Sequence, residues 1–108
     1  MKAPICATIP ALLFAAAVQA QQPAEDIYNK KCAVCHGKDG LGNTAKGKKV
    51  HVKDVRTNLK DSETEMVKVV TEGKGDDMDS YKNLYSPEQI KQLVAYYRGL
   101  GEAAAAKK

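Results

Sequence analysis

Cys32-Ala33-Val34-Cys35-His36 is the stretch that decides how this 108-residue chain folds. It places two thiols three residues apart, with a histidine immediately after the second. Three kinds of site use such residues: a disulfide or redox pair, a zinc site, and a c-type haem attachment site. A thioredoxin-like redox pair would need a βαβ pattern, which the sequence lacks, and no fourth zinc ligand is evident.

Residues 1–20 have the three-part pattern of a secretory signal peptide. Lys2 gives a positive start, an apolar run covers 11–18, and Val18-Gln19-Ala20 offers small residues before a cleavage site at Gln21. An uncleaved membrane anchor is the alternative, although prolines interrupt a stretch already short for a span of about 20 residues. We therefore predict an exported, periplasmic protein.

Export leaves Cys32 and Cys35 as the only cysteines. An exported pair is normally a disulfide, but the adjacent His36 changes the interpretation. Two thiols at a helix end can form thioethers with the two vinyl groups of one haem, and the histidine can then bind the iron. Because c-type haem is attached after export, the signal peptide and the motif support each other. We predict one covalently attached haem c.

The chain is too small to form a large core from its own side chains. Residues 1–20 hold 15 of its 47 apolar residues, so the remainder is short and polar. This excludes a large enzyme with separate substrate and cofactor domains, as well as a multi-span membrane protein. We expect a signal peptide at 1–20, one haem-binding domain at 21–101 and a flexible tail at 102–108, with the haem filling the interior.

Three helices are expected. The first runs from Ala24 to about Ala33, and the second begins at Ser62, where Glu65 completes a capping box, and ends at Gly73. The third begins at Ser86-Pro87-Glu88-Gln89, shows a helical apolar face, and is expected to end at Gly99 and Gly101. Residues 43–60 lack a helical period, and their valines indicate an extended loop or one short strand. Residues 73–85 are expected to form a loop.

Over residues 27–100 the chain resembles the class I c-type cytochromes in their small bacterial monohaem form. The residues that carry this resemblance are the haem motif with Tyr28 ahead of it, the glycine-spaced segment 37–42, Gly73-Lys74-Gly75 ahead of Met78, and segments 86–90 and 93–98. The resemblance implies an all-α class I cytochrome c fold, with three or more helices and long loops wrapped around one covalently bound haem. In that family the first and last helices cross, so Tyr28 is expected to meet Leu93 and one of Tyr96 or Tyr97.

The resemblance implies that His36 and Met78 are the axial iron ligands. The alternatives for the second ligand are Met66, which lies on the apolar stripe of an expected helix, His51 in a lysine-rich stretch, and an open or water-bound position. The family commonly has proline after the ligand methionine, where this chain has Asp79.

The family also uses a proline carbonyl to orient the ligand histidine. No proline occurs between His36 and Ser86, so some other carbonyl is expected to accept the second imidazole N–H.

Histidine and methionine ligation would fill both axial positions, which favours electron transfer over catalysis. We expect a one-electron carrier between redox partners of a respiratory or related electron-transport chain, and not an enzyme. Two alternatives are a haem-based sensor or weak peroxidase with an open or labile sixth iron position, and a tethered cytochrome subunit of a larger oxidoreductase.

The formal net charge of +4 is unevenly distributed. Residues 21–53 hold seven lysines and three carboxylates, whereas residues 54–108 hold nine basic and ten acidic residues. Lysines flank the haem motif on both sides, which indicates a redox partner with an acidic surface. We expect a monomer without a membrane span after cleavage, and no nucleic-acid binding, because arginine is sparse and no binding motif is present.

Overall fold

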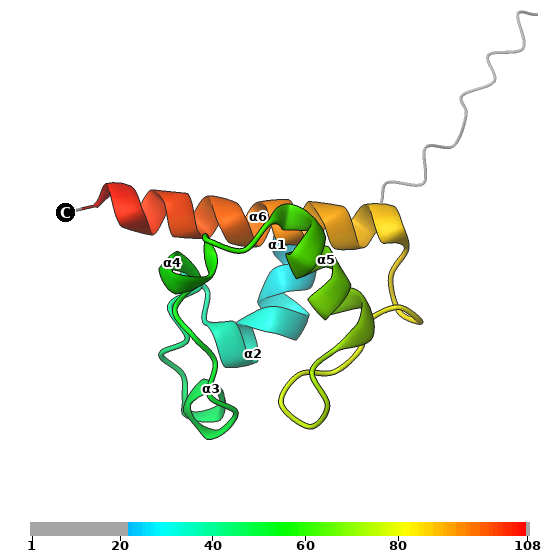
Figure 1. The fold of residues 1–108 in the computed structure, drawn as a ribbon, viewed down its shortest axis with the longest axis horizontal. Coiled ribbons are helices and arrows are strands. Elements are labelled where there is room, and N and C mark those ends of the chain that lie inside the picture. Colours follow the sequence, from blue (N-terminus) through cyan, green and yellow to red (C-terminus); the bar gives the residue numbers. More distant parts are fainter. Residues whose placement is uncertain (1–21, 108) are drawn as a thin grey trace, which may run out of the picture.

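The computed structural model describes residues 22–107, so the expected signal peptide at 1–20 lies outside the described residues. The described part is helical and contains no strand, which confirms the all-α expectation. Figure 1 shows the long C-terminal helix α6 across one side of the molecule and the shorter elements packed beneath it. No helix in residues 22–107 combines the length and apolar character needed to cross a bilayer.

The haem motif closes a continuous N-terminal helical segment. It consists of α1 (Ala24–Ile27), a π-helical turn η1 (Tyr28–Cys32) and α2 (Ala33–His36). The segment therefore runs three residues beyond its expected end at Ala33. It stops at Gly37, whose φ of 81° lies in the left-handed region that glycine adopts without strain.

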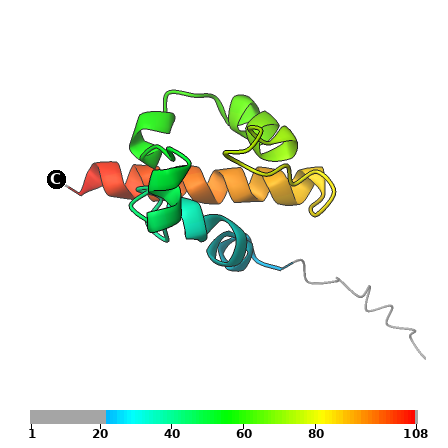
Figure 2. The ribbon, with the colours of Figure 1, turned by 90° about the horizontal axis from the view of Figure 1, so that it is seen from below.

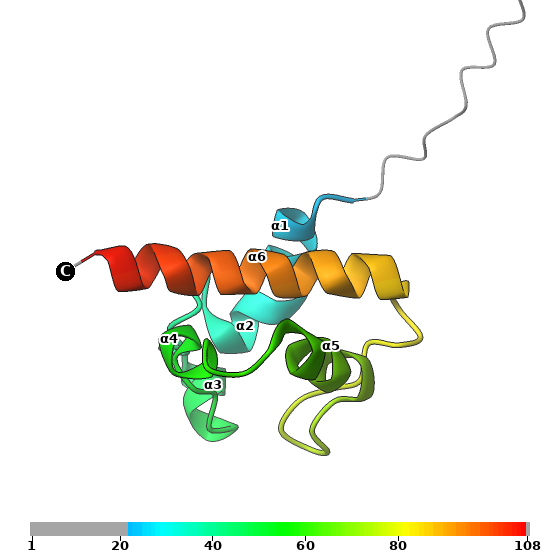
Figure 3. The same cartoon turned by 45° about the horizontal axis from the view of Figure 1, so that its top comes forward.

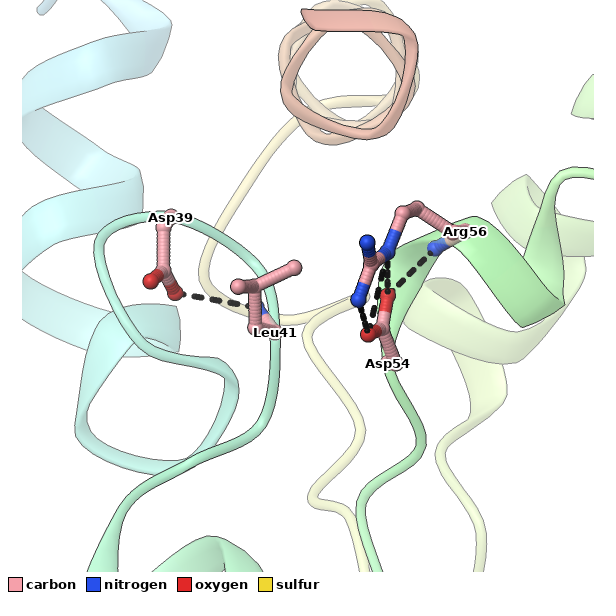
Figure 4. Close-up of polar contacts among 4 residues, drawn as sticks. All are labelled: Asp39, Leu41, Asp54 and Arg56. Carbon is pink, nitrogen blue, oxygen red and sulfur yellow. Dashed lines mark hydrogen bonds and ion pairs between the residues drawn. The ribbon is translucent and has the colours of Figure 1, made fainter. Parts of the chain in front are cut away.

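Residues 43–60 differ from the expected loop or strand. They form two short helices, α3 (Ala45–Lys49) and α4 (Val55–Asn58). Thr44 caps α3 and Asp54 caps α4, each by accepting a backbone N–H. Asp54 also pairs with Arg56 (Figure 4), with a shortest distance of 2.6 Å between carboxylate oxygen and guanidinium nitrogen. Four- and five-residue helices are too short for an apolar period, which is why the sequence pattern did not reveal them.

The two capping boxes are confirmed. α5 (Glu63–Glu72) begins after Ser62, which exchanges hydrogen bonds with Glu65, and it ends at Gly73. α6 (Pro87–Ala106) begins after Ser86, which makes the same exchange with Gln89. The segment 73–85 between them is a loop, as expected, with one isolated backbone bridge.

α6 does not end at Gly99 and Gly101; it continues to Ala106. A β-carbon on Gly101 would lie 2.9 Å from Val55 and 3.1 Å from Leu59, so this glycine permits close packing of α6 on α4 and does not end the helix. The alanines at 103–106 then extend the helix, because alanine has the highest helix propensity. Residues 102–106 are therefore helical and not the expected flexible tail.

The N-terminal helical segment crosses α6. Figures 2 and 3 show α1 on one side of α6, with α4 and α5 on the other. Tyr28 is buried in a cluster with Leu93, and its ring centroid lies 5.2 Å from Tyr96 and 6.3 Å from Tyr97. The expected contact between the first and last helices is therefore confirmed, and it involves both tyrosines.

Candidate functional site

One cavity of about 820 Å³ lies beneath α6 and is lined by nearly every element of the fold. Valine and leucine side chains form much of its wall: Val50, Val52, Val69, Val70, Leu93 and Val94. All four residues expected at the haem site, Cys32, Cys35, His36 and Met78, line this same cavity. The size and apolar character of the cavity match those of small-molecule and cofactor sites.

The two cysteines are half-buried and form no disulfide with each other. Burial raises the pKa of the Cys32 thiol to about 11, with a smaller contribution from nearby Cys35. A thiol with so high a pKa stays protonated at neutral pH, unlike the thiolate of a redox-active or nucleophilic cysteine. The Cys32 thiol therefore lacks the lowered pKa of a cysteine that is active in thiol redox chemistry.

Four backbone carbonyls in and directly after the motif accept hydrogen bonds from outside or at the end of the helix. Gly37 N–H donates to Ala33 O (2.8 Å) and Gly42 N–H to His36 O (2.8 Å). The Thr44 hydroxyl donates to Cys35 O over 2.8 Å. The Tyr28 hydroxyl donates to Gly37 O over 2.7 Å. These bonds satisfy the carbonyls that a helix C-terminus leaves unpaired, so the motif is held rigidly.

Gly47 lets α3 approach the motif. A β-carbon at this position would overlap the carbonyl oxygen of Cys35 and lie 2.8 Å from the Thr44 hydroxyl. Sequence reasoning missed both Thr44 and Gly47 as supporting residues. The N-cap preference of threonine before Ala45-Lys46 was a usable signal for Thr44, whereas the role of Gly47 depends on a contact distant in sequence.

His36 is half-buried overall, but its Nδ1 atom is fully covered. Burial lowers its pKa, so the neutral form that binds a metal is favoured. The ring of Tyr97 stands edge-on to it at a centroid distance of 5.1 Å, and Asn58 Nδ2 donates to the Tyr97 hydroxyl over 3.0 Å. The expected carbonyl partner is not found, because Nδ1 of His36 has no hydrogen-bond partner in the part of the chain that the structure describes. Packing against Tyr97 positions the ring instead.

Met78 lies in a tight turn between α5 and α6. Lys74 N–H donates to Met78 O over 2.8 Å, and Asp77 N–H donates to Lys74 O over 3.1 Å. Gly73, with φ of 77°, passes so close that an added β-carbon would lie 2.6 Å from Met78 O. The side chain of Met78 is half-buried and faces the cavity.

The other two ligand candidates also line the cavity but are placed differently. Met66 is 8% exposed in the packing between α5 and α6, and its sulfur lies 3.6 Å from Arg98 Nη1, which donates to it. The same nitrogen donates to Asp61 O, so Arg98 fixes the start of α5. His51 is solvent-exposed, with φ of 58°. Arg98 is a further supporting residue that the sequence did not indicate.

These donors fit a covalently bound haem. Two free thiols, a half-buried imidazole whose neutral form is favoured, and a methionine thioether line one largely apolar cavity. Thioether-forming cysteines, histidine and methionine are the residues by which proteins bind haem of this type.

A family model described as "Cytochrome C oxidase, cbb3-type, subunit III" matches residues 19–96. The chain belongs to this family. It is a small class I c-type cytochrome, an electron carrier with covalently bound haem c and its iron. Domains of this kind are typically exported.

Two known proteins support the assignment. This cytochrome is 33% identical over 82 residues to the cbb3-type cytochrome c oxidase subunit FixP of Azorhizobium caulinodans. The match covers 76% of this chain and 28% of that relative, so the chain spans little more than a quarter of its length. A solved structure, the KustC0563 c-type cytochrome, matches with a TM-score of 0.68 at 27% identity, over 73% of this chain and 98% of its own. The cytochrome c fold is therefore confirmed.

Proposed function

We propose that this cytochrome is an exported, periplasmic one-electron carrier of a respiratory or related electron-transport chain, in which Cys32 and Cys35 form the thioethers and His36 and Met78 are the axial iron ligands. The observation that carries the proposal is that all four side chains line one apolar cavity. The haem iron supplies a centre that gains and loses one electron. His36 and Met78 would occupy both protein-ligand positions of the iron and leave none open to a substrate, which supports a carrier and not an enzyme.

The residues around the motif support this role because they fix the position of the cysteines and of His36. The hydrogen bonds to the carbonyls of Cys35, His36 and Gly37 fix the motif, and Tyr97 packs on the imidazole. A ligand set that cannot move changes little between oxidation states, which favours fast electron transfer. We further propose that the carrier is a monomer with one haem, that its signal peptide comprises residues 1–20, and that its redox partner presents an acidic surface to the lysines near the motif.

Met78 is favoured over Met66 as the sixth ligand because the sulfur of Met66 already accepts a hydrogen bond from Arg98. Met78→Ala and Met66→Ala test this choice. Oxidised cytochromes with methionine on the iron show a weak long-wavelength absorption band. We expect the band to disappear in Met78→Ala and to remain in Met66→Ala, and the reverse pattern would assign the ligand to Met66.

A tethered subunit of a larger oxidoreductase is the second candidate function. It is favoured by the match to FixP, which is named as a subunit of a cbb3-type oxidase. Mass spectrometry of the N-terminus separates the two candidates when the protein is expressed in its native host. A chain that begins at Gln21 supports a free carrier, whereas a retained N-terminus and co-purification with membrane proteins support a subunit.

A further inference from the structure

The charged residues that line the cavity divide into two groups. Between residues 28 and 53 the lining contains four lysines and no carboxylate, and we call this group the basic rim: Lys30, Lys31, Lys46 and Lys53. Between residues 58 and 79 it contains five carboxylates and Lys74, and we call this group the acidic rim: Asp61, Glu65, Asp76, Asp77 and Asp79. The two parts of the lining thus carry opposite charge.

The two rims come from different elements. The basic rim lies on η1, on α3 and in the segment after α3, whereas the acidic rim lies at the start of α5 and in the turn that holds Met78. Figures 1 and 3 show α3 and the loop after α5 on opposite sides of the space beneath α6. All of these side chains are exposed except Asp61, which is half-buried.

Neither rim neutralises the other. Within residues 22–107 the only ion pair joins Asp54 and Arg56, and neither of these residues lines the cavity. The opposite charges therefore remain available to an approaching molecule. An exposed apolar side chain lines the same cavity: Val34, between the two cysteines, is 52% exposed. An apolar centre with a charged periphery is the usual composition of a protein–protein interface.

We propose that the redox partner docks over this cavity with a face of two signs, presenting carboxylates to the basic rim and lysine or arginine side chains to the acidic rim. This inference rests on the proposed function, because docking here transfers electrons only if the haem lies inside the cavity. A partner face of one sign would be attracted by one rim and repelled by the other. A two-signed face is attracted by both and is also turned into a single orientation.

Small charged oxidants test the two rims separately. The reduced holoprotein is mixed in a stopped-flow instrument with ferricyanide, an anion, or with tris(phenanthroline)cobalt(III), a cation; each takes one electron from the iron. Because each oxidant has an attractive rim, we expect both rates to fall as salt rises and the Debye length shortens from about 30 Å at 0.01 M to about 8 Å at 0.15 M. If the surface acted as a single positive or negative charge, rising salt would lower the rate of one oxidant and raise the rate of the other. That result would overturn the inference.

Rim variants locate the effect. At low salt Lys30→Gln/Lys46→Gln/Lys53→Gln should slow ferricyanide on the order of 5-fold and should not slow the cobalt complex, which the lysines repel. The matching variant of the acidic rim should slow the cobalt complex and should not slow ferricyanide: Asp61→Asn/Glu65→Gln/Asp76→Asn. It leaves Asp77 and Asp79, the neighbours of Met78, unchanged. The matched controls are two triple variants outside the cavity lining, Lys60→Gln/Lys91→Gln/Lys107→Gln and Glu25→Gln/Asp26→Asn/Glu88→Gln.

The outcomes separate this inference from the proposed function. If control variants change both rates as much as rim variants do, only net charge matters and the two-signed docking face is wrong, while the electron carrier stands. If the purified protein carries no haem or reacts with neither oxidant, the proposed function itself fails. The absorption spectrum of each variant confirms that its haem site is intact.

Discussion

The hydroxyl of Tyr28 lies 2.7 Å from the carbonyl oxygen of Gly37 and donates a hydrogen bond to it. One side chain thereby joins the middle of the N-terminal helical segment to the residue directly after the haem motif. The ring of Tyr28 is 2% exposed and packs against Tyr96 and Tyr97 of α6. The same residue therefore connects the crossing of the two helices to the end of the haem motif.

Tyr28→Phe tests this connection. The ring contacts remain, but the buried carbonyl of Gly37 loses its donor. We expect the free energy of unfolding of the holoprotein, measured with denaturant, to fall by about 1–3 kcal/mol. Tyr96→Phe is the matched control, because no hydrogen bond of the Tyr96 hydroxyl is found among the described residues. Equal losses in the two variants would show that the Gly37 bond contributes nothing.

Gly47→Ala should destabilise the motif by overpacking. Its β-carbon would overlap the carbonyl oxygen of Cys35, which is backbone and cannot rotate away. The expected loss of stability is about 1–3 kcal/mol. Gly99→Ala is the control on the exposed side of α6, where a β-carbon meets nothing within 4 Å. Thermal unfolding should show that this second variant is more stable by about 0.5–1 kcal/mol, because alanine favours the helix.

Gly73→Ala should weaken the proposed bond between Met78 and the iron. The variant combines a strained φ of 77° with a β-carbon 2.6 Å from the carbonyl oxygen of Met78, so the turn must move. We expect the long-wavelength methionine band to weaken or vanish and carbon monoxide to bind faster to the reduced protein. Gly75→Ala, at φ of 55° but in open space, should keep the band and lose only about 1–2 kcal/mol of stability. An unchanged band in both variants would argue against Met78 as the ligand.

The helix boundaries that the sequence predicted correctly are those with local signals. The capping boxes at Ser62 and Ser86 and the stop at Gly73 depend on residues within one helical turn, so a reader of the sequence can recognise them. Two further correct predictions came from the resemblance to class I c-type cytochromes: the contact of Tyr28 with α6, and the all-α fold. The four expected haem-site residues line one cavity, as a shared haem site requires.

The errors occurred where distant contacts outweigh local preference. Glycine commonly ends a helix, but Gly101 lies inside α6. Val55 and Leu59 pack so closely against it that a side chain would not fit. Val55 is fully buried beneath it and belongs to a helix of only four residues. Within residues 22–107 no carbonyl accepts from His36 Nδ1, and this could not be predicted because it depends on which segments fold over the ring.

The stability of the folded protein should depend on pH through the carboxyl group of Asp54. Hydrogen bonds from the Arg56 side chain hold the pKa of the Asp54 carboxyl below its usual value. A carboxyl with a lower pKa in the folded state stabilises the protein above its unfolded pKa, and this contribution is lost as pH falls through the folded value. Asp54→Asn keeps the cap acceptor but not the charge. We therefore expect the variant to melt below the wild type at neutral pH and the difference to shrink in acid; a constant difference would mean that the charge is not involved.

The mass of the purified, exported protein and of its proteolytic peptides tests the central claim most directly. We predict a red protein whose intact mass includes one haem, with that haem on the peptide that contains Cys32 and Cys35 and with neither thiol open to alkylation after denaturation. A colourless protein of unmodified mass, in which reduction frees two thiols that had been joined as a disulfide, would contradict it.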